Sequence, residues 1–175
     1  AVYHGKDGLI KIATKIATLT QLLENGISSL DYNQENENFF DTLKIKVSSE
    51  DKDKIKKLAE KNYLNFRYFE TDHIGISLDE TTQVSNVLDI LNIFSEVSGK
   101  SLEINLNNID DLNHNISGNQ IRNSEFLSHE VFNKYHTEHE ILRYMKRLEN
   151  KDLSLVHSMI SLGSCTMKLN ATTEM

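Results

Sequence analysis

The sequence predicts an α+β fold, with a small three-stranded antiparallel sheet covered by helices, followed by an irregular connector and a helical extension. One reason is the order of patterns up to residue 99, which reads helix, strand, helix, strand, strand, helix. Another is that each strand alternates apolar and polar residues, so that only one face of the sheet needs covering. The third is an asparagine-rich stretch that breaks both periodicities after residue 99.

The first helix is expected over residues 7–26, and polar residues 31–38 predict a loop behind it. Its apolar residues recur at helical spacing: Leu9, Ile12, Ile16, Leu19 and Leu23. We expect Gly26 to end this helix, because glycine adopts the left-handed conformation of a helix C-terminus without steric cost.

Three strands are expected, at residues 39–47, 66–69 and 74–78, and the last two are close enough for a hairpin. Ser48 and Asp51 form a capping pattern at the start of the second helix. The third helix is predicted to begin at Thr81 or Thr82 and to end at Gly99.

Domain boundaries follow from the change in character along the chain. Residues 1–100 are predicted to be the small α+β domain, 101–128 an asparagine-rich connector, and 129–175 a helical segment ending in a loop. In that last segment, Thr137 and Glu140 predict a helix start by their capping-box spacing.

Charge and composition exclude several classes of function. The 175 residues carry a net charge of −7, which opposes general binding to nucleic acids or anionic membranes. No stretch approaches the roughly 18 apolar residues of a membrane span. Cys165 is the single cysteine, so no disulfide can form within the chain.

Few residues are arranged for chemistry. His129, His136 and His139 lie close in sequence, but zinc needs three or four suitable ligands, so we expect solvated or capping histidines and no metal site. Cys165 and His157 could form a thiolate–imidazolium pair, although no third, orienting group stands at a recognisable spacing.

The C-terminal segment carries the most distinctive pattern. Small and hydroxyl residues at 163–166 precede Lys168 and Asn170, and such a run could bring backbone amides, hydroxyls and an amine to a carboxylate or phosphate. An ordinary polar loop would explain the same pattern nearly as well.

Segment 161–170, SLGSCTMKLN, closely resembles the GSCTMK motif of the P-protein family of the glycine cleavage system. Segment 135–149 resembles the same family's YHxExxxxRYMxxLE stretch. Shorter stretches at 1–5, 39–43 and 75–80 also resemble the family, in the same order. The connector matches poorly, and Ser161 stands where the family commonly has proline.

The resemblance implies a pyridoxal-phosphate enzyme of fold type I, which decarboxylates glycine and passes the aminomethyl group to the lipoyl arm of H-protein. Such enzymes are built from two homologous halves, in one chain or in two subunits, and a dimer of two-half units is implied. Residues 1–100 would end the first half and 129–175 would open the second.

The resemblance implies no catalytic residue in this chain, because the lysine that carries the cofactor lies in the family within a later His-Lys segment. The chain alone is therefore expected neither to hold pyridoxal phosphate well nor to be active. The residues that would lie near substrate or cofactor are Ser164, Cys165, Thr166, Lys168 and Asn170. Of these, Ser164 and Thr166 would donate hydrogen bonds to a carboxylate or phosphate, Lys168 would add positive charge, and Asn170 would orient the loop.

Two other readings stay open. The small domain could be a non-catalytic module that docks on the remaining half of the enzyme or on H-protein, or a regulatory domain that binds amino acids. Neither nucleic acid nor membrane is an expected partner. The family resemblance places the protein in bacterial cytoplasm, with the mitochondrial matrix as the alternative.

Overall fold

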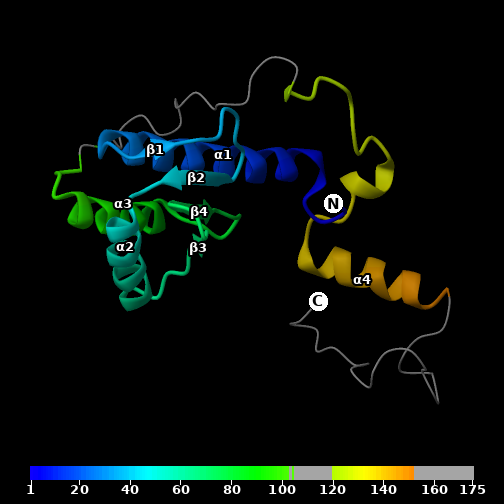
Figure 1. Ribbon diagram of the computed structural model, residues 1–175. Coiled ribbons are helices and arrows are strands. Elements are labelled where there is room, and N and C mark those ends of the chain that lie inside the picture. The colour runs from blue at the N-terminus through cyan, green and yellow to red at the C-terminus, as the bar shows by residue number, and fades with distance from the viewer. Residues whose placement is uncertain (103, 105–119, 152–175) are drawn as a thin grey trace. The chain divides into compact units, whose positions relative to one another are not determined.

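A computed structural model describes residues 1–102, 104 and 120–151, and it has the α+β architecture that the sequence predicts (Figure 1). The chain divides into two compact units, residues 10–124 and residues 1–9 with 125 onward. The elements are α1 (Gly5–Ser29), β1 (Asn33–Gln34), β2 (Thr42–Lys46), α2 (Ser49–Lys61), β3 (Arg67–Tyr68), β4 (His73–Ser77), α3 (Val84–Ser98), the 3₁₀ helix η3 (Glu130–Asn133) and α4 (Glu138–Glu149). The predicted boundaries at residues 100 and 128 stay predictions.

The sheet has four strands in the order β1-β2-β4-β3, and every pair is antiparallel. The prediction of three strands was therefore wrong by one, although the predicted hairpin of β3 and β4 is confirmed. The missed strand is β1, where Asn33 pairs with Lys46 and Gln34 with Ile45. Two polar residues at a sheet edge show no alternation, because backbone pairing alone holds them there.

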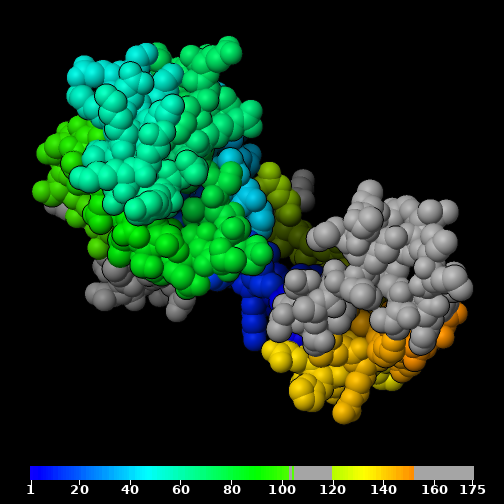
Figure 2. All heavy atoms as spheres, turned by 90° about the horizontal axis from the view of Figure 1, so that it is seen from below, coloured from blue at the N-terminus to red at the C-terminus, as the bar shows by residue number. Residues whose placement is uncertain are grey.

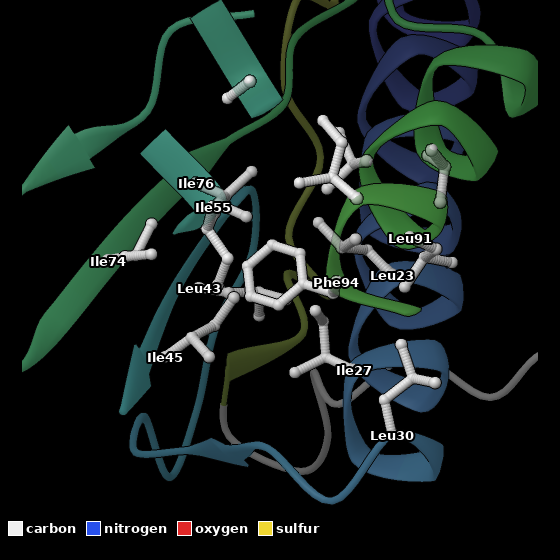
Figure 3. Packing of buried hydrophobic residues seen from close by; sticks show 14 of the residues in the cluster. Leu23, Ile27, Leu30, Leu43, Ile45, Ile55, Ile74, Ile76, Leu91 and Phe94 are labelled. Atoms are coloured by element: carbon white, nitrogen blue, oxygen red, sulfur yellow. The ribbon is translucent and has the colours of Figure 1, made fainter. Parts of the chain in front are cut away.

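The core of the 10–124 unit lies between one face of the sheet and the helices (Figure 3). Phe94 from α3 is fully buried and occupies the centre of this layer. Side chains from β2 and β4 point at it from the sheet, and side chains from α1 and α3 pack on its other side: Leu43, Ile45, Ile74, Ile76, Leu23, Ile27 and Leu91. The Tyr32 and Phe66 rings complete the contact. Tyr32 is edge-to-face with Phe94 at a centroid distance of 5.2 Å, and Phe66 is tilted against it at 6.4 Å.

Gly26 does not end α1, which continues to Ser29. A Cβ atom at Gly26 would lie 2.5 Å from a methyl carbon of Leu91, which is far inside van der Waals contact. Glycine is therefore required here for the close approach of α1 and α3, not for a left-handed turn. Glycine at position 26 is thus explained by helix packing and not by the end of a helix.

The other helix ends test the capping predictions directly. Ser48 caps α2 as predicted, since its side chain accepts a hydrogen bond from the Asp51 amide. Gly99 ends α3 in the left-handed conformation, with φ of 70°. The predicted threonine cap of α3 is wrong, because Gln83 occupies that position, and the threonine hydroxyls donate instead to the Asp79 carboxylate.

The solvent-facing side of α2 is in view in Figure 2, in cyan-green. Its lysines alternate with acids, as in the ion pair of Lys54 with Glu50 at 2.6 Å. Only Ile55 and Ala59 of this helix are buried. The lysines and acids of α2 thus form a solvated helix face.

Candidate functional site

The five residues that the sequence places near a ligand, Ser164, Cys165, Thr166, Lys168 and Asn170, lie outside the described residues, and so does His157. The described part of the chain brings together two other stretches that resemble the P-protein family. Residues 1–9 and the segment 125–151 belong to one compact unit, although more than 100 residues separate them in sequence. The candidate site is built from these two stretches.

The junction between the two stretches is formed by Gly5 and His136. The Nδ1 atom of His136 lies 2.7 Å from the carbonyl oxygen of Tyr3. Gly5 has φ of 63°, and a Cβ atom there would lie 2.9 Å from both the His136 ring and the Phe132 carbonyl oxygen. Glycine is needed at this position for two reasons, its left-handed backbone and the closeness of the imidazole ring.

A cavity of about 310 Å³ opens beside this junction. Its lining is polar and consists of His4, Gly5, Lys6, Asp7, Asn133 and His136. The ammonium group of Lys6 lies 5.7 Å from the centroid of the Phe126 ring, in a cation–π arrangement. Two imidazoles, one carboxylate and one ammonium make the cavity able to donate and accept protons, but they do not select one reaction.

His129, like His136, has a structural role. His129 caps η3, because its Nδ1 accepts a hydrogen bond from the Val131 amide at 3.1 Å. Across the described ranges, no three His, Cys, Asp or Glu side chains are grouped so that they could hold a metal ion. Sequence reasoning missed the junction of His136 with Gly5, because contacts between residues 131 positions apart leave no local pattern.

Helix α4 begins with the capping box that the sequence predicts. Thr137 accepts a hydrogen bond from the Glu140 amide at 3.3 Å, and the Glu140 carboxylate accepts from the Thr137 amide at 3.2 Å. The Thr137 hydroxyl also donates to this carboxylate and is the main cause of a lowered Glu140 pKa. Glu140 is therefore a charged residue whose carboxylate is hydrogen-bonded at the start of α4.

One face of α4 forms a shallow groove with the loop before it. The groove has a volume of about 360 Å³ and is lined by Lys134, Tyr135, Glu140, Arg143, Tyr144 and Arg147. The rings of Tyr135 and Tyr144 are stacked, with centroids 4.4 Å apart and an angle of 16° between the planes. The Arg147 guanidinium lies over both rings, at 5.5 and 5.2 Å from their centroids.

In the 10–124 unit, the sheet face opposite the core carries a charged cluster. The Glu35 carboxylate is 2.9 Å from the Lys44 ammonium and 2.9 Å from Nε2 of His73. The hydrogen bond from Lys44, and then the close contact with His73, lower the pKa of Glu35 to about 2. The cluster links Glu35, the residue after β1, to β2 and β4, which gives it a structural role at the sheet edge.

The chain matches a known protein family. Residues 1–94, more than half of the chain, match the model of the family described as glycine cleavage system P-protein. The chain belongs to this family. That membership accounts for the ordered set of motifs on which the resemblance was based.

Individual P-protein relatives match the chain from end to end. A glycine dehydrogenase (decarboxylating) of Bacteroides fragilis is 46% identical over 177 aligned residues, which cover 99% of this chain and 18% of the relative. The protein of the same name from Flavobacterium johnsoniae is 45% identical, over 100% of this chain and 18% of the relative. The human relative, named as mitochondrial, is 45% identical, over 100% of this chain and 17% of the relative.

This P-protein chain thus spans less than a fifth of the length of the curated relatives it matches. Its relatives include both bacterial proteins and a mitochondrial one. Among the described helices, none is long and apolar enough to cross a membrane.

Pyridoxal phosphate is the cofactor that P-protein membership implies, and the described cavity residues do not fit it. The cofactor needs a lysine amine free to bond to its carbonyl carbon and a cradle of donors for its phosphate. Lys6 is the one lysine among the cavity residues, and its ammonium is held over the Phe126 ring. We therefore derive no step through the cofactor from this cavity.

Proposed function

We propose that the chain is a segment of a glycine-decarboxylating P-protein and supplies a wall of the active site, without the reactive centre. The observation that carries this proposal is identity of about 45% along the whole chain to proteins named glycine dehydrogenase (decarboxylating). Identity that extends from end to end makes a shared role for this segment the simplest explanation.

The complete reaction would decarboxylate glycine and transfer the aminomethyl group to the lipoyl arm of H-protein. Pyridoxal phosphate, when bound by the complete protein, supplies an electron sink for the carbanion that decarboxylation leaves. The remaining half of the same enzyme and lipoylated H-protein would be the partners, in a dimer of two-half units. Bacterial cytoplasm or mitochondrial matrix would be the location.

In this proposal the chain's own contribution to binding comes from the 163–170 segment. Ser164 and Thr166 donate hydrogen bonds to a substrate carboxylate or cofactor phosphate, and Lys168 adds a positive charge to the same anion. Asn170 orients the loop, and Cys165 is a small neighbour that allows close approach. The chain by itself is then inactive.

A chimera tests this proposal. The aligned region of the Bacteroides fragilis relative is replaced by this chain, and release of labelled carbon dioxide from carboxyl-labelled glycine is measured with lipoylated H-protein. We expect an active chimera and no activity from the 175-residue chain alone. A chimera that folds and binds cofactor but releases no carbon dioxide would refute the proposal, and so would activity of the isolated chain.

Variants of the chimera test the assigned roles. Lys168→Met is expected to lower the rate about tenfold or more, because one charge-assisted hydrogen bond contributes roughly 1.5–3 kcal/mol. Lys151→Met, which removes an exposed lysine after α4, is the matched control and should leave the rate unchanged. Equal rates for both variants would remove Lys168 from the site.

A further inference from the structure

The groove on α4 carries an excess of positive charge on an otherwise acidic chain. Lys134, Arg143 and Arg147 line it together with a single acid, Glu140. Lys134 is paired with Glu130 outside the lining, so the excess rests on the two arginines. Glu140 is already held by the cap of α4, and the chain as a whole has a net charge of −7. The two arginines thus give the groove a local excess of positive charge on an acidic chain.

Among the described lining residues, the two arginines share the groove with one acid, Glu140, whose carboxylate is engaged by the Thr137 cap. Arg143 has no hydrogen-bond or ion-pair partner among the described residues, and its exposed side chain stands one helical turn from Arg147. Like charges four residues apart on a helix repel by a few tenths of a kcal/mol. An anion placed between them would remove this repulsion, so the site is poised to accept one.

The aromatic pair fixes one of these charges in place. Arg147 donates a hydrogen bond from Nη2 to the Tyr135 hydroxyl while its guanidinium lies over the Tyr135 and Tyr144 rings. A guanidinium held in this way loses little freedom when it binds a carboxylate with its remaining N–H groups. Tyrosine and arginine are also the residues most enriched among energetic anchors of protein interfaces.

We propose that this groove, lined by Lys134, Tyr135, Glu140, Arg143, Tyr144 and Arg147, binds an acidic segment of a partner protein. The carboxylates of that segment pair with Arg143 and Arg147. A protein segment fits better than a free small anion, because the groove is shallow and its arginines are exposed, whereas small-molecule sites bury most of their ligand. The proposal does not rest on the decarboxylase assignment.

The test measures binding of a fluorescein-labelled hexaglutamate peptide to the 175-residue chain by fluorescence anisotropy, with hexaglutamine as the uncharged control. We expect saturable binding of hexaglutamate alone, weakened between ~0.05 and ~0.5 M salt, since exposed charges are screened over that range. Arg143→Gln and Arg147→Gln should each weaken binding about fivefold, as expected for an exposed ion pair.

Lys146→Gln is the matched control, because it removes the same charge from the same helix without touching the groove. Lys146 instead pairs with Glu149 at 2.7 Å. The affinity of the Lys146→Gln chain for hexaglutamate should stay within about twofold of that of the parent chain. Far-UV circular dichroism verifies that all three variants keep their helices, and amide chemical shifts should change on peptide addition within residues 134–147.

Three results would overturn the proposal. The first is an equal loss of affinity in Lys146→Gln, which would mean non-specific attraction to any cation of α4. The second is equal binding of hexaglutamine or no binding of hexaglutamate. The third is inorganic phosphate that binds the groove as tightly as the peptide, at constant ionic strength, which would make this a free-anion site.

Discussion

Each of the two compact units of this P-protein chain is stabilised by a different kind of interaction. Among the described residues, every fully buried apolar side chain belongs to residues 10–124. The described part of the other unit relies on a helix cap, a histidine–carbonyl contact and stacked tyrosines, and α4 buries no residue there. The first unit therefore carries its own driving force for folding, while the described contacts of the second mainly fix geometry.

This difference has a thermodynamic consequence. Burying apolar area contributes about 25 cal/mol per Å², whereas single exposed hydrogen bonds and ion pairs contribute about 1 kcal/mol or less. Substitutions in the two units should thus differ in how much stability they remove and in how far along the chain the effect extends. Core changes should lower the stability of the whole 10–124 unit, and changes around α4 should act locally.

The largest effect is expected from Phe94→Ala, which removes the ring at the centre of the core. The loss should be about 3–5 kcal/mol in the free energy of unfolding, because a buried aromatic is lost and a cavity is left. Denaturant titration followed by circular dichroism measures it. Tyr63→Ala is the control at a side chain that is 95% exposed, and it should change stability by less than about 0.5 kcal/mol.

Next in size are two glycines with positive φ, one in each unit. Gly99→Ala should cost about 1 kcal/mol, because nothing lies within 4 Å of its new Cβ and only backbone strain is added. Gly5→Ala should cost about 2–4 kcal/mol locally, because the new Cβ also meets the His136 ring and the Phe132 carbonyl. Chemical shifts of the His136 ring give the readout.

Equal effects of these two glycine substitutions, or an unshifted His136 ring in Gly5→Ala, would contradict the junction between the two stretches. Unfolding of the 10–124 unit by Gly5→Ala would also contradict it, because the contacts of Gly5 belong to the other unit.

A smaller effect is expected from Thr137→Ala, which removes the cap of α4. Loss of a threonine cap costs about 1 kcal/mol, and here the result should be faster hydrogen exchange confined to α4. Thr137→Ser keeps the hydroxyl and should behave like the parent chain. Faster exchange spread over α3 as well would show that α4 is not an independent local unit.

The smallest effect concerns acid stability and the pKa of Glu35, which is lowered to about 2 by Lys44 and His73. A carboxyl whose pKa is lowered on folding stabilises the folded state above its ordinary pKa. That contribution is lost as the pH falls from about 4.5 toward 2. Denaturation of parent and Glu35→Gln chains across this range should show a stability difference that shrinks with acid. A difference that stays constant would refute the assigned cause.

Much of the fold could be predicted because its causes are local. Alternation placed the strands around Leu43 and Ile76, and cap chemistry placed the starts of α2 and α4 at Ser48 and Thr137. The threonine cap of α3 failed for a local reason, since both hydroxyls donate to Asp79. Two other failures had causes elsewhere in the chain. Strand β1 depends on a backbone partner in β2, and Gly26 depends on Leu91, so neither could be read from nearby residues.

The candidate site was predictable only in part. The motif of segment 135–149 was recognised from sequence, and His136 is exposed as expected, but its contact with Gly5 was not predicted. A glycine at the start of a helix, such as Gly5, has no single interpretation in the sequence, because both a left-handed backbone and close packing select glycine. The stacking of Tyr135 on Tyr144 likewise needs the loop conformation, which no spacing rule supplies.

Native-state hydrogen exchange tests most directly whether one region is complete within this chain while the other needs the rest of the P-protein. In the isolated chain, amides of α3 should exchange only by global unfolding, and those of α4 should exchange far faster. In a complete P-protein that contains the chain, protection of α4 should rise strongly and that of α3 should stay the same. Equal protection of both helices in the isolated chain, or no gain for α4 in the complete protein, would contradict this account.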